Sequence, residues 1–287
     1  MKHTKSLVLA LIRTILLGLI AALVLTPVLL AIINSLMTEQ EIVANYGSLG
    51  KTDTNIFVNL KLIPDWVSFE QYYRVLIATP VFLRMFWNSA GLVVPIIVGQ
   101  VIAATLASFA LARLRFPGRD ALFFVYLMTM MMPFQVTLVP NYMMVERLGL
   151  MNTPGAIIWP GVFSAFGVFL LRQFMLHIHS AYIEAAKMDG AGYVRIFASI
   201  VLPMVKPGVA ALVILLFVDY WNMVEQPLIF LQEAAYQPLS VFLSVIQKDM
   251  LGISFAASVI YMIPMMLLFL SAEHYLIEGI QLSGVKG

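Results

Sequence analysis

The sequence predicts an all-α integral membrane protein with six transmembrane helices. The chain is 61% hydrophobic and only 11% charged, whereas soluble domains carry about 25% charged residues. Uncharged apolar runs of about the 20 residues that a spanning helix needs recur along it. Seventeen basic against fifteen acidic residues give a net charge of +2, too balanced for nucleic-acid binding. The absence of cysteine excludes disulfides and thiolate chemistry.

The first span is expected at Thr14–Ile33, directly after a basic N-terminal segment. A cleaved signal peptide is the alternative interpretation. Its apolar core should be only about 7–15 residues long, and the run here exceeds that. We therefore expect an uncleaved first helix whose N-terminus lies in the cytoplasm.

Residues from about 37 to 80 are too polar to cross a bilayer, and we expect an external loop with short helical pieces. Within it, Gly50-Lys51-Thr52 resembles the end of a phosphate-binding loop. The earlier glycine that such a loop requires is replaced by Asn45, and no buried strand precedes it. The chain is therefore not expected to bind ATP itself.

Five more spans are expected along the rest of the chain, at Arg84–Leu111, 121–140, 156–176, Gly208–Gln226 and Ile253–Leu276. Six spans place both termini on one side of the membrane. That side, which includes the 113–119 turn and the 172–207 segment, carries eleven of the seventeen Lys and Arg residues. Because positive charge is enriched in cytoplasmic loops, we expect both termini to be cytoplasmic.

The segment from about 178 to 207 is polar and lies between two apolar spans. A short helix is predicted over 181–189, and Gly190 is its natural left-handed stop. A second helix is predicted after Gly192, since apolar residues recur there at helical spacing: Tyr193, Ile196, Phe197, Ile200 and Val201. Two short helices joined by a sharp turn form a protruding knob that a cleft on another protein can grip.

The order of residues in this segment is distinctive. Glu184-Ala185-Ala186 is followed by three residues and Gly190, and then by Ile200 and Leu202-Pro203. This pattern resembles the cytoplasmic coupling loop of permease subunits of binding-protein-dependent ABC importers. The chain is similar to the sugar-type permeases, of the maltose-transporter kind, over nearly its whole length, in the stretches Trp87-Asn88-Ser89, Ala110–Gly118, Met132-Pro133 with Pro140, Trp221-Asn222, Pro227-Leu228 and Gly284–Gly287.

The resemblance implies a single transmembrane permease domain over 1–287 with the type I ABC importer permease fold. It implies partners: a homologous second permease, two ATPase subunits that hold ATP and Mg, and an extracytoplasmic substrate-binding protein, all at the lipid bilayer. The chain itself would have no catalytic residues, cofactor or metal. The residues that would contact the ATPase are Glu184, Ala185, Ala186, Asp189 and Gly190.

The sequence departs from this family pattern at three positions. His179 stands where the family usually has proline, and Ala181 stands where an acidic residue is common. We expect Ser180 to cap the short helix instead. Met223 follows Trp221-Asn222 where an acidic residue is frequent, and Asp219 or Glu225 can take over its role.

Asp219 is the one carboxylate placed well inside a predicted span, about 17 Å along the helix from Gly208. Ionisable residues inside a membrane usually face a bundle interior or a wet cavity. With Trp221 and Asn222, Asp219 is a candidate to line a sugar pathway. A structural hydrogen bond to a neighbouring helix, or to a partner permease, is an equal alternative. His177 and His179, two residues apart, point to different faces of a helix and are not expected to share a metal.

The expected function is import of a carbohydrate, either an oligosaccharide or a related polyol. Transport would occur by alternating access, driven by ATP hydrolysis in partner subunits. A non-sugar solute such as glycerol phosphate is the alternative within the family. A secondary transporter or channel would show inverted repeats or several intramembrane charges, and neither is visible. A membrane-embedded enzyme is a third alternative, but no nucleophile–base pair is apparent.

Overall fold

The computed structural model describes residues 2–47, 59–245 and 250–284, with side chains described for 10–47, 59–245 and 250–272. Within these residues every regular element is helical, as the composition predicts. The chain divides into two compact units, Met1–Leu83 with Val245–Ile263 and Arg84–Ser244 with Pro264–Gly287. That the two units act as a single permease domain remains a prediction.

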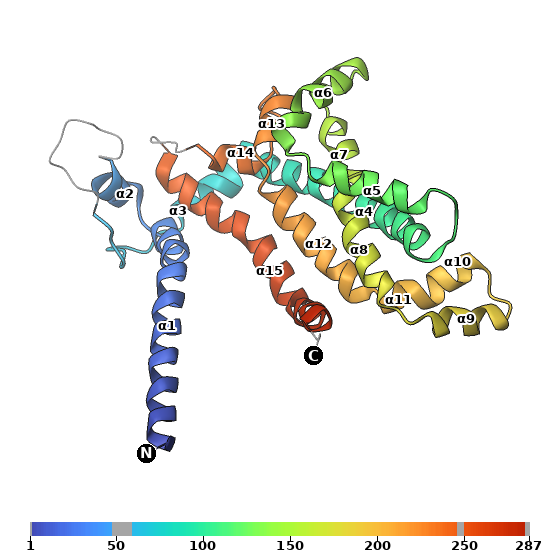
Figure 1. The fold of residues 1–287 in the computed structure, drawn as a ribbon. Helices are drawn as coiled ribbons and strands as arrows, with labels where there is room; N and C mark the ends of the chain where they lie inside the picture. The colour runs from blue at the N-terminus through green and yellow to red at the C-terminus, as the bar shows by residue number, and fades with distance from the viewer. Residues whose placement is uncertain (1, 48–58, 246–249, 285–287) are drawn as a thin grey trace. The chain divides into compact units, whose positions relative to one another are not determined.

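The first unit contains the segment that was too polar to span. It holds α1 (Lys2–Ser35), α2 (Glu39–Tyr46), α3 (Glu70–Tyr73), a π-helical turn at Arg74–Ala78 and the first part of α15 (Leu251–Gly284) (Figure 1). The polar segment thus contains short helical pieces, as predicted, although residues 48–58 lie outside the described residues. A small apolar core of Met37, Ile42 and Tyr46 packs against Ile33, Leu251 and Phe255.

Within the residues that the structure describes, four stretches of helix are long and apolar enough to cross a membrane: Ala10–Ser35, Pro80–Arg113, Gly155–Leu176 and Leu251–Ala272. The number rises to six if each of two bent helix pairs is one span, which is the number that the sequence predicts. The second stretch is α4 (Pro80–Arg113), and the third comprises α7 (Gly155–Val162) and α8 (Ala165–Leu176).

The third predicted span, 121–140, is a bent pair of helices and not one continuous helix. It comprises α5 (Arg119–Met130) and α6 (Phe134–Arg147), which meet at an angle of 101°. Pro133 has an extended backbone and directly precedes α6. A residue before proline is pushed away from the helical region, so Met132-Pro133 ends one helix and starts another.

The fifth predicted span also ends early. It was expected to reach Gln226, but α12 (Lys206–Trp221) ends five residues sooner and α13 (Glu225–Phe230) follows it. At its other end α12 is bent by 71° from the helical stretch Tyr193–Met204. Asn222 therefore lies at a helix break and not inside a helix.

Close helix packing in the second unit depends on small residues. Helix α8 packs against both α5 and α12, and α8 and α12 run side by side in Figure 1. A Cβ added at Gly208 of α12 would come within 2.6 Å of the Phe174 ring, and one at Gly161 within 2.9 Å of Ile96. Membrane helices associate through such small residues because these let the backbones approach.

The Trp87-Asn88-Ser89 stretch holds a distant segment of the chain against α4. The Asn88 side-chain amide donates hydrogen bonds to the backbone carbonyls of Ala235 (2.8 Å) and Gln237 (3.1 Å). The Ser89 hydroxyl accepts one from the Leu239 N–H at 3.0 Å. These bonds fix the segment that leads into α14 (Leu239–Leu243).

Candidate functional site

The 178–207 segment folds as a helical knob. Helix α9 (Ser180–Met188) is followed by a turn, by α10 (Tyr193–Ile196), by a π-helical turn at Phe197–Val201 and by α11 (Leu202–Met204). Gly190 has a φ of +77°, and the N–H of the next residue, Ala191, donates to the Ala186 carbonyl at 2.9 Å. This is a left-handed helix stop, so the predicted conformation of Gly190 is confirmed.

The knob has its own apolar core, to which both arms and the neighbouring spans contribute: Phe109, Met175, Ile178, Ala186, Ile196, Val201 and Val205. Ala186 is buried here, whereas Ala185 is exposed. The small size of Ala186 therefore lets α9 pack closely against its own second arm. Only Ala185 of this alanine pair lies on the outer surface of the chain.

The start of α9 differs from the prediction. His179, not Ser180, is the N-cap residue, and its Nδ1 accepts a hydrogen bond from the Ala181 N–H at 3.4 Å. Ser180 is already the first helical residue. The histidine side chain thus provides the cap that a serine was expected to supply. His177 Nδ1 separately contacts the Gln173 carbonyl oxygen at 2.7 Å.

An arginine connects the knob to the helices below it. The Arg113 guanidinium, at the C-terminal end of α4, donates to the backbone carbonyls of Met175 and Ile178. These carbonyls belong to the last turn of α8 and the residues just after it, where the regular hydrogen bonding of the helix ends. Phe109 of α4 and Phe197 also contact each other, with ring centroids 5.2 Å apart. These contacts connect the knob to α4 and to the end of α8.

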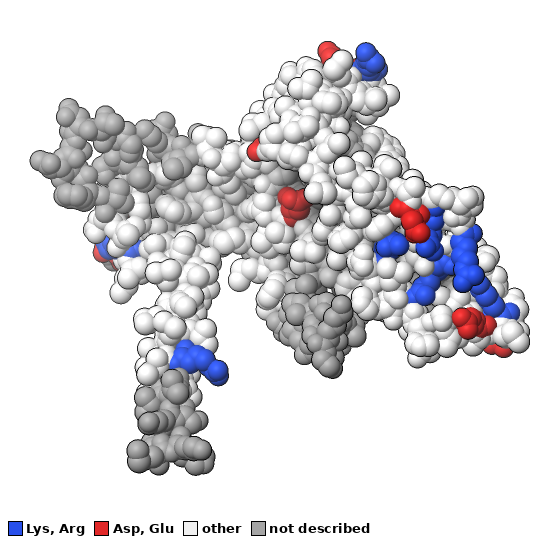
Figure 2. Space-filling model, viewed as in Figure 1, with Lys and Arg blue, Asp and Glu red and all other residues white. Residues whose placement is uncertain are grey.

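The outer face of the knob is mixed polar and apolar. Glu184, Lys187 and Asp189 are exposed, and Figure 2 shows charged atoms gathered over the part of the chain that α9–α11 form. Met188 and Val194 lie beside the turn and are 88% and 81% exposed. Sequence reasoning missed these two. In the sequence they could have been found as large apolar residues that do not belong to the apolar faces of the two short helices.

A cavity of about 840 Å³ lies in the second unit, within the size range of small-molecule sites. It is bordered by three breaks in the helices: the bend between α5 and α6, the gap at Phe163–Ser164 between α7 and α8, and the region after α12. Irregular backbone is tolerated at membrane depth where it lines a cavity. The side chains with polar groups that line it are Tyr126, Thr129, Thr137, Asn141, Ser164, Asp219, Tyr220 and Gln226.

The three predicted pathway residues occupy different places. Asp219 lines this cavity and also an adjoining hollow, which Asn222 lines as well. Trp221 is only 2% exposed, and its ring stacks on Phe217 (5.0 Å) and meets Phe86 edge-on (5.6 Å). Trp221 therefore packs between helices. Asp219 lies in the last turn of α12, beside a break, and not in the interior of a span.

Comparison with known proteins identifies the family. A family model described as the inner membrane component of binding-protein-dependent transport systems matches residues 100–280, which is more than half of the chain. The chain belongs to this family. The knob lies at 178–207, within the matched region, and so does the cavity.

The permease has relatives of more than one kind. It is 28% identical, over the full length of both chains, to an arabinooligosaccharides transport system permease protein of Halalkalibacterium halodurans. It is 36% identical over 151 residues to an sn-glycerol-3-phosphate transport system permease protein of Brucella abortus, across 53% of this chain and 54% of that one.

A solved structure has the same fold. It is a chain of a bacterial ABC transporter involved in the import of the acidic polysaccharide alginate, with a TM-score of 0.78 and 22% sequence identity. The match covers 93% of this chain and 96% of the other. The chain therefore has the all-helical permease fold of that transporter and is a multi-pass membrane component of a transport system.

Proposed function

We propose that the chain is the permease subunit of an importer for an uncharged carbohydrate, an oligosaccharide or a related polyol. Transport is driven by ATP hydrolysis in partner subunits. The partners are a homologous second permease, two ATPase subunits and an extracytoplasmic binding protein. The chain itself catalyses no reaction and binds no cofactor.

The packed knob is the observation that carries this proposal. Its two arms share one apolar core, while Glu184, Ala185, Asp189 and Gly190 lie exposed on the outside. A rigid, charged projection suits a cleft on an ATPase. Its connection through Arg113 to the end of α8 provides a route from nucleotide-driven motion to the helices around the cavity.

The charge of the cavity favours a neutral substrate. Among the described residues that line it, Asp219 is the one with a formal charge at neutral pH, and no Lys, Arg or His is among them. An anionic solute would approach Asp219 without a compensating cation, an unfavourable contact in a poorly solvated site. Hydroxyl and amide groups on Tyr126, Asn141 and Gln226 are suited to sugar hydroxyls. Glycerol phosphate, suggested by the second group of relatives, is the less favoured substrate.

The test is a reconstituted complex of the permease with its second permease, ATPase and binding protein, assayed for ATPase stimulation. Neutral arabinose- or glucose-containing oligosaccharides, uronic-acid oligosaccharides and glycerol 3-phosphate form the panel. We expect stimulation by neutral members of the panel. Stimulation by an anionic member alone would overturn the substrate class, and flux through the permease without an ATPase would overturn the importer itself.

Asp219 is expected to act in transport by hydrogen bonding more than by charge. The variant Asp219→Asn keeps two hydrogen-bonding groups of the same size and should retain most uptake. Asp219→Leu removes them and leaves a substrate hydroxyl without a partner, which costs about 1–3 kcal/mol, so uptake should be largely lost. Complete loss in both variants, with normal assembly, would show instead that the charge is required.

The orientation follows from the charge bias, with both termini and the knob in the cytoplasm. The chain lacks cysteine, so a single introduced cysteine reports its side of the membrane. In intact cells an impermeant thiol reagent should label Glu233→Cys, which is exposed between α13 and α14, but not Arg115→Cys in the turn after α4. The opposite pattern would invert the topology.

A further inference from the structure

The segment Leu60–Phe69 in the first unit exposes an unusual amount of apolar surface. Six of its ten residues are large apolar side chains, with exposed fractions from 62% for Leu62 to 78% for Trp66: Leu60, Leu62, Ile63, Trp66, Val67 and Phe69. A contiguous exposed apolar patch normally marks a surface that is covered by something else. We refer to this segment as loop 60–69.

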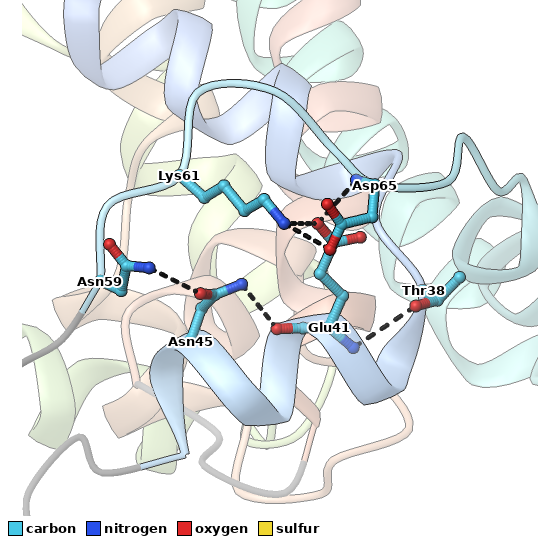
Figure 3. Close-up of polar contacts among 6 residues, drawn as sticks. All are labelled: Thr38, Glu41, Asn45, Asn59, Lys61 and Asp65. Atoms are coloured by element: carbon cyan, nitrogen blue, oxygen red, sulfur yellow. Dashed lines mark hydrogen bonds and ion pairs between the residues drawn. The ribbon is translucent and has the colours of Figure 1, made fainter.

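The polar residues of loop 60–69 are satisfied from within the first unit. Lys61 Nζ lies 3.0 Å from Glu41 Oε1 and 2.5 Å from Asp65 Oδ2, and the Asp65 N–H donates to the same Glu41 oxygen at 2.9 Å. Figure 3 shows these groups turned toward α2 and toward one another. The Ser68 hydroxyl accepts from the Glu70 N–H at 3.2 Å. The loop therefore turns its apolar side chains outward, and Lys61 pairs with two carboxylates, of which Asp65 stays largely exposed.

Two hydrogen bonds fix the position of the loop relative to α1. The Ser68 N–H donates to the Leu36 carbonyl at 2.8 Å, and the hydroxyls of Ser35 and Tyr72 lie 2.7 Å apart. Ser35 is the last residue of α1. The apolar run that ends at Ile33 spans about 30 Å at 1.5 Å per residue, the thickness of a bilayer's hydrocarbon core. In a bilayer that α1 crosses over this run, the Ser68 end of loop 60–69 lies at the level where the hydrocarbon meets the headgroups.

We propose that loop 60–69 is an interfacial membrane anchor. Ile63, Trp66 and Phe69 would insert between the headgroups and the acyl chains of the leaflet at the C-terminal end of α1, which is the outer leaflet in the proposed topology. Aromatic side chains are enriched at this depth. The span of α1 is likewise unburied within the chain. Asp65 keeps its carboxylate largely exposed beside these side chains, which suits the mixed polar and apolar character of the headgroup region.

The anchor can be tested with a nitroxide spin label at Trp66→Cys in the assembled transporter. The complex would be reconstituted in vesicles of phosphatidylethanolamine and phosphatidylglycerol. Collision of the label with oxygen, which partitions into lipid, is compared with collision with a water-soluble nickel chelate. Leu23→Cys, exposed in the middle of α1, is the hydrocarbon reference, and Glu146→Cys, exposed near the end of α6, is the aqueous reference. A second label at Val67→Cys keeps Trp66 in place.

We expect both loop positions to favour oxygen over the nickel chelate, at a depth shallower than that of Leu23→Cys. A preference for the chelate, as at Glu146→Cys, would place the loop in water and overturn the proposal. Low collision with both reagents would show that a protein covers the loop, either the second permease or the binding protein. That outcome would overturn the proposal equally.

Discussion

Two parts of this chain that lie outside the predicted spans are built in opposite ways. The knob formed by α9–α11 has an apolar core around Ala186 and Ile196, and its charged residues Glu184, Lys187 and Asp189 face outward. Loop 60–69 has an ion-paired centre formed by Lys61, Glu41 and Asp65, and its large apolar residues face outward. The knob has the pattern of a surface for an aqueous protein partner. The loop has the pattern of a surface for lipid.

This difference shows why a hydropathy average is a poor guide to what a loop contacts. Both lie in segments that are too polar to span a bilayer, 37–80 and 178–207, and both of those segments contain short helices. What separates them is the direction in which their charges point, and that depends on internal partners. Lys187, for example, lies 5.2 Å from the ring centroid of Tyr193 on the surface of the knob, whereas Lys61 is engaged by two carboxylates.

The variant Glu184→Ala should have the largest effect. A carboxylate that is partly desolvated against a basic group of the ATPase is worth far more than an exposed pair, and truncating one partner typically costs about 2–5 kcal/mol. We expect the ATPase to dissociate from the permease pair at least about thirtyfold more readily, as measured by affinity in detergent or nanodiscs. Glu146→Ala, which removes an exposed carboxylate from α6, is the matched control. Unchanged affinity in Glu184→Ala would remove the basis for an ATPase-facing knob.

The variant Met188→Ala should weaken the same contact by less. Met188 is almost fully exposed in the isolated chain, and burying a methionine side chain is worth about 1.5–3 kcal/mol. Trp66→Ala provides the comparison, because it removes an equally exposed apolar side chain from the loop and should leave ATPase affinity unchanged. Equal weakening by both variants would contradict the assignment of the two surfaces to different partners.

Gly190→Val is expected to uncouple ATP hydrolysis from uptake while the permease still inserts. Nothing lies within 4 Å of a Cβ built at Gly190, so the obstacle is its φ of +77°, which costs an ordinary L-residue about 1–2 kcal/mol. Gly190→Asn should retain more uptake, since asparagine tolerates this conformation. Gly192→Ala is the control, because Gly192 also has free space but a φ of −72°. Wild-type uptake by Gly190→Val would show that this turn is not needed for coupling.

The sequence predicted the knob better than the cavity because local signals decide its shape. Gly190 is a stop that depends on its own conformation, and α9 starts and ends within one residue of the predicted 181–189. That His179 and not Ser180 is the N-cap of α9 could not be anticipated, since the side chain of either residue can accept a hydrogen bond from a free N–H at the helix start. The inward direction of Ala186 likewise depends on the second arm of the knob.

The cavity could not be predicted because it arises from helix breaks. Pro133 breaks a span, yet Pro95, Pro140 and Pro264 lie inside continuous helices, so proline alone does not mark a break. Neighbouring helices determine whether the freed backbone groups are satisfied. The end of α12 at Trp221 was also missed, because the residues around it are apolar enough to continue a span. The ring that was predicted to line a pathway instead packs between Phe86 and Phe217.

The ion-paired centre of loop 60–69 should give the smallest effect, visible only at high pH. Hydrogen bonds from Lys61 to Asp65 and to Glu41 raise the pKa of the Lys61 ammonium above the ordinary lysine value of about 10.4. A group whose pKa is raised by folding stabilises the folded loop fully below its unfolded pKa, and loses that contribution as the pH rises through the folded value. The mobility of a nitroxide at Val67→Cys should therefore stay constant from neutral pH to the unfolded lysine pKa and increase only above it. Lys61→Gln should be mobile throughout, whereas Lys61→Arg should stay ordered to still higher pH. An increase in mobility near neutral pH would show that Lys61 does not hold the loop, and that the apolar residues keep their outward direction by other contacts.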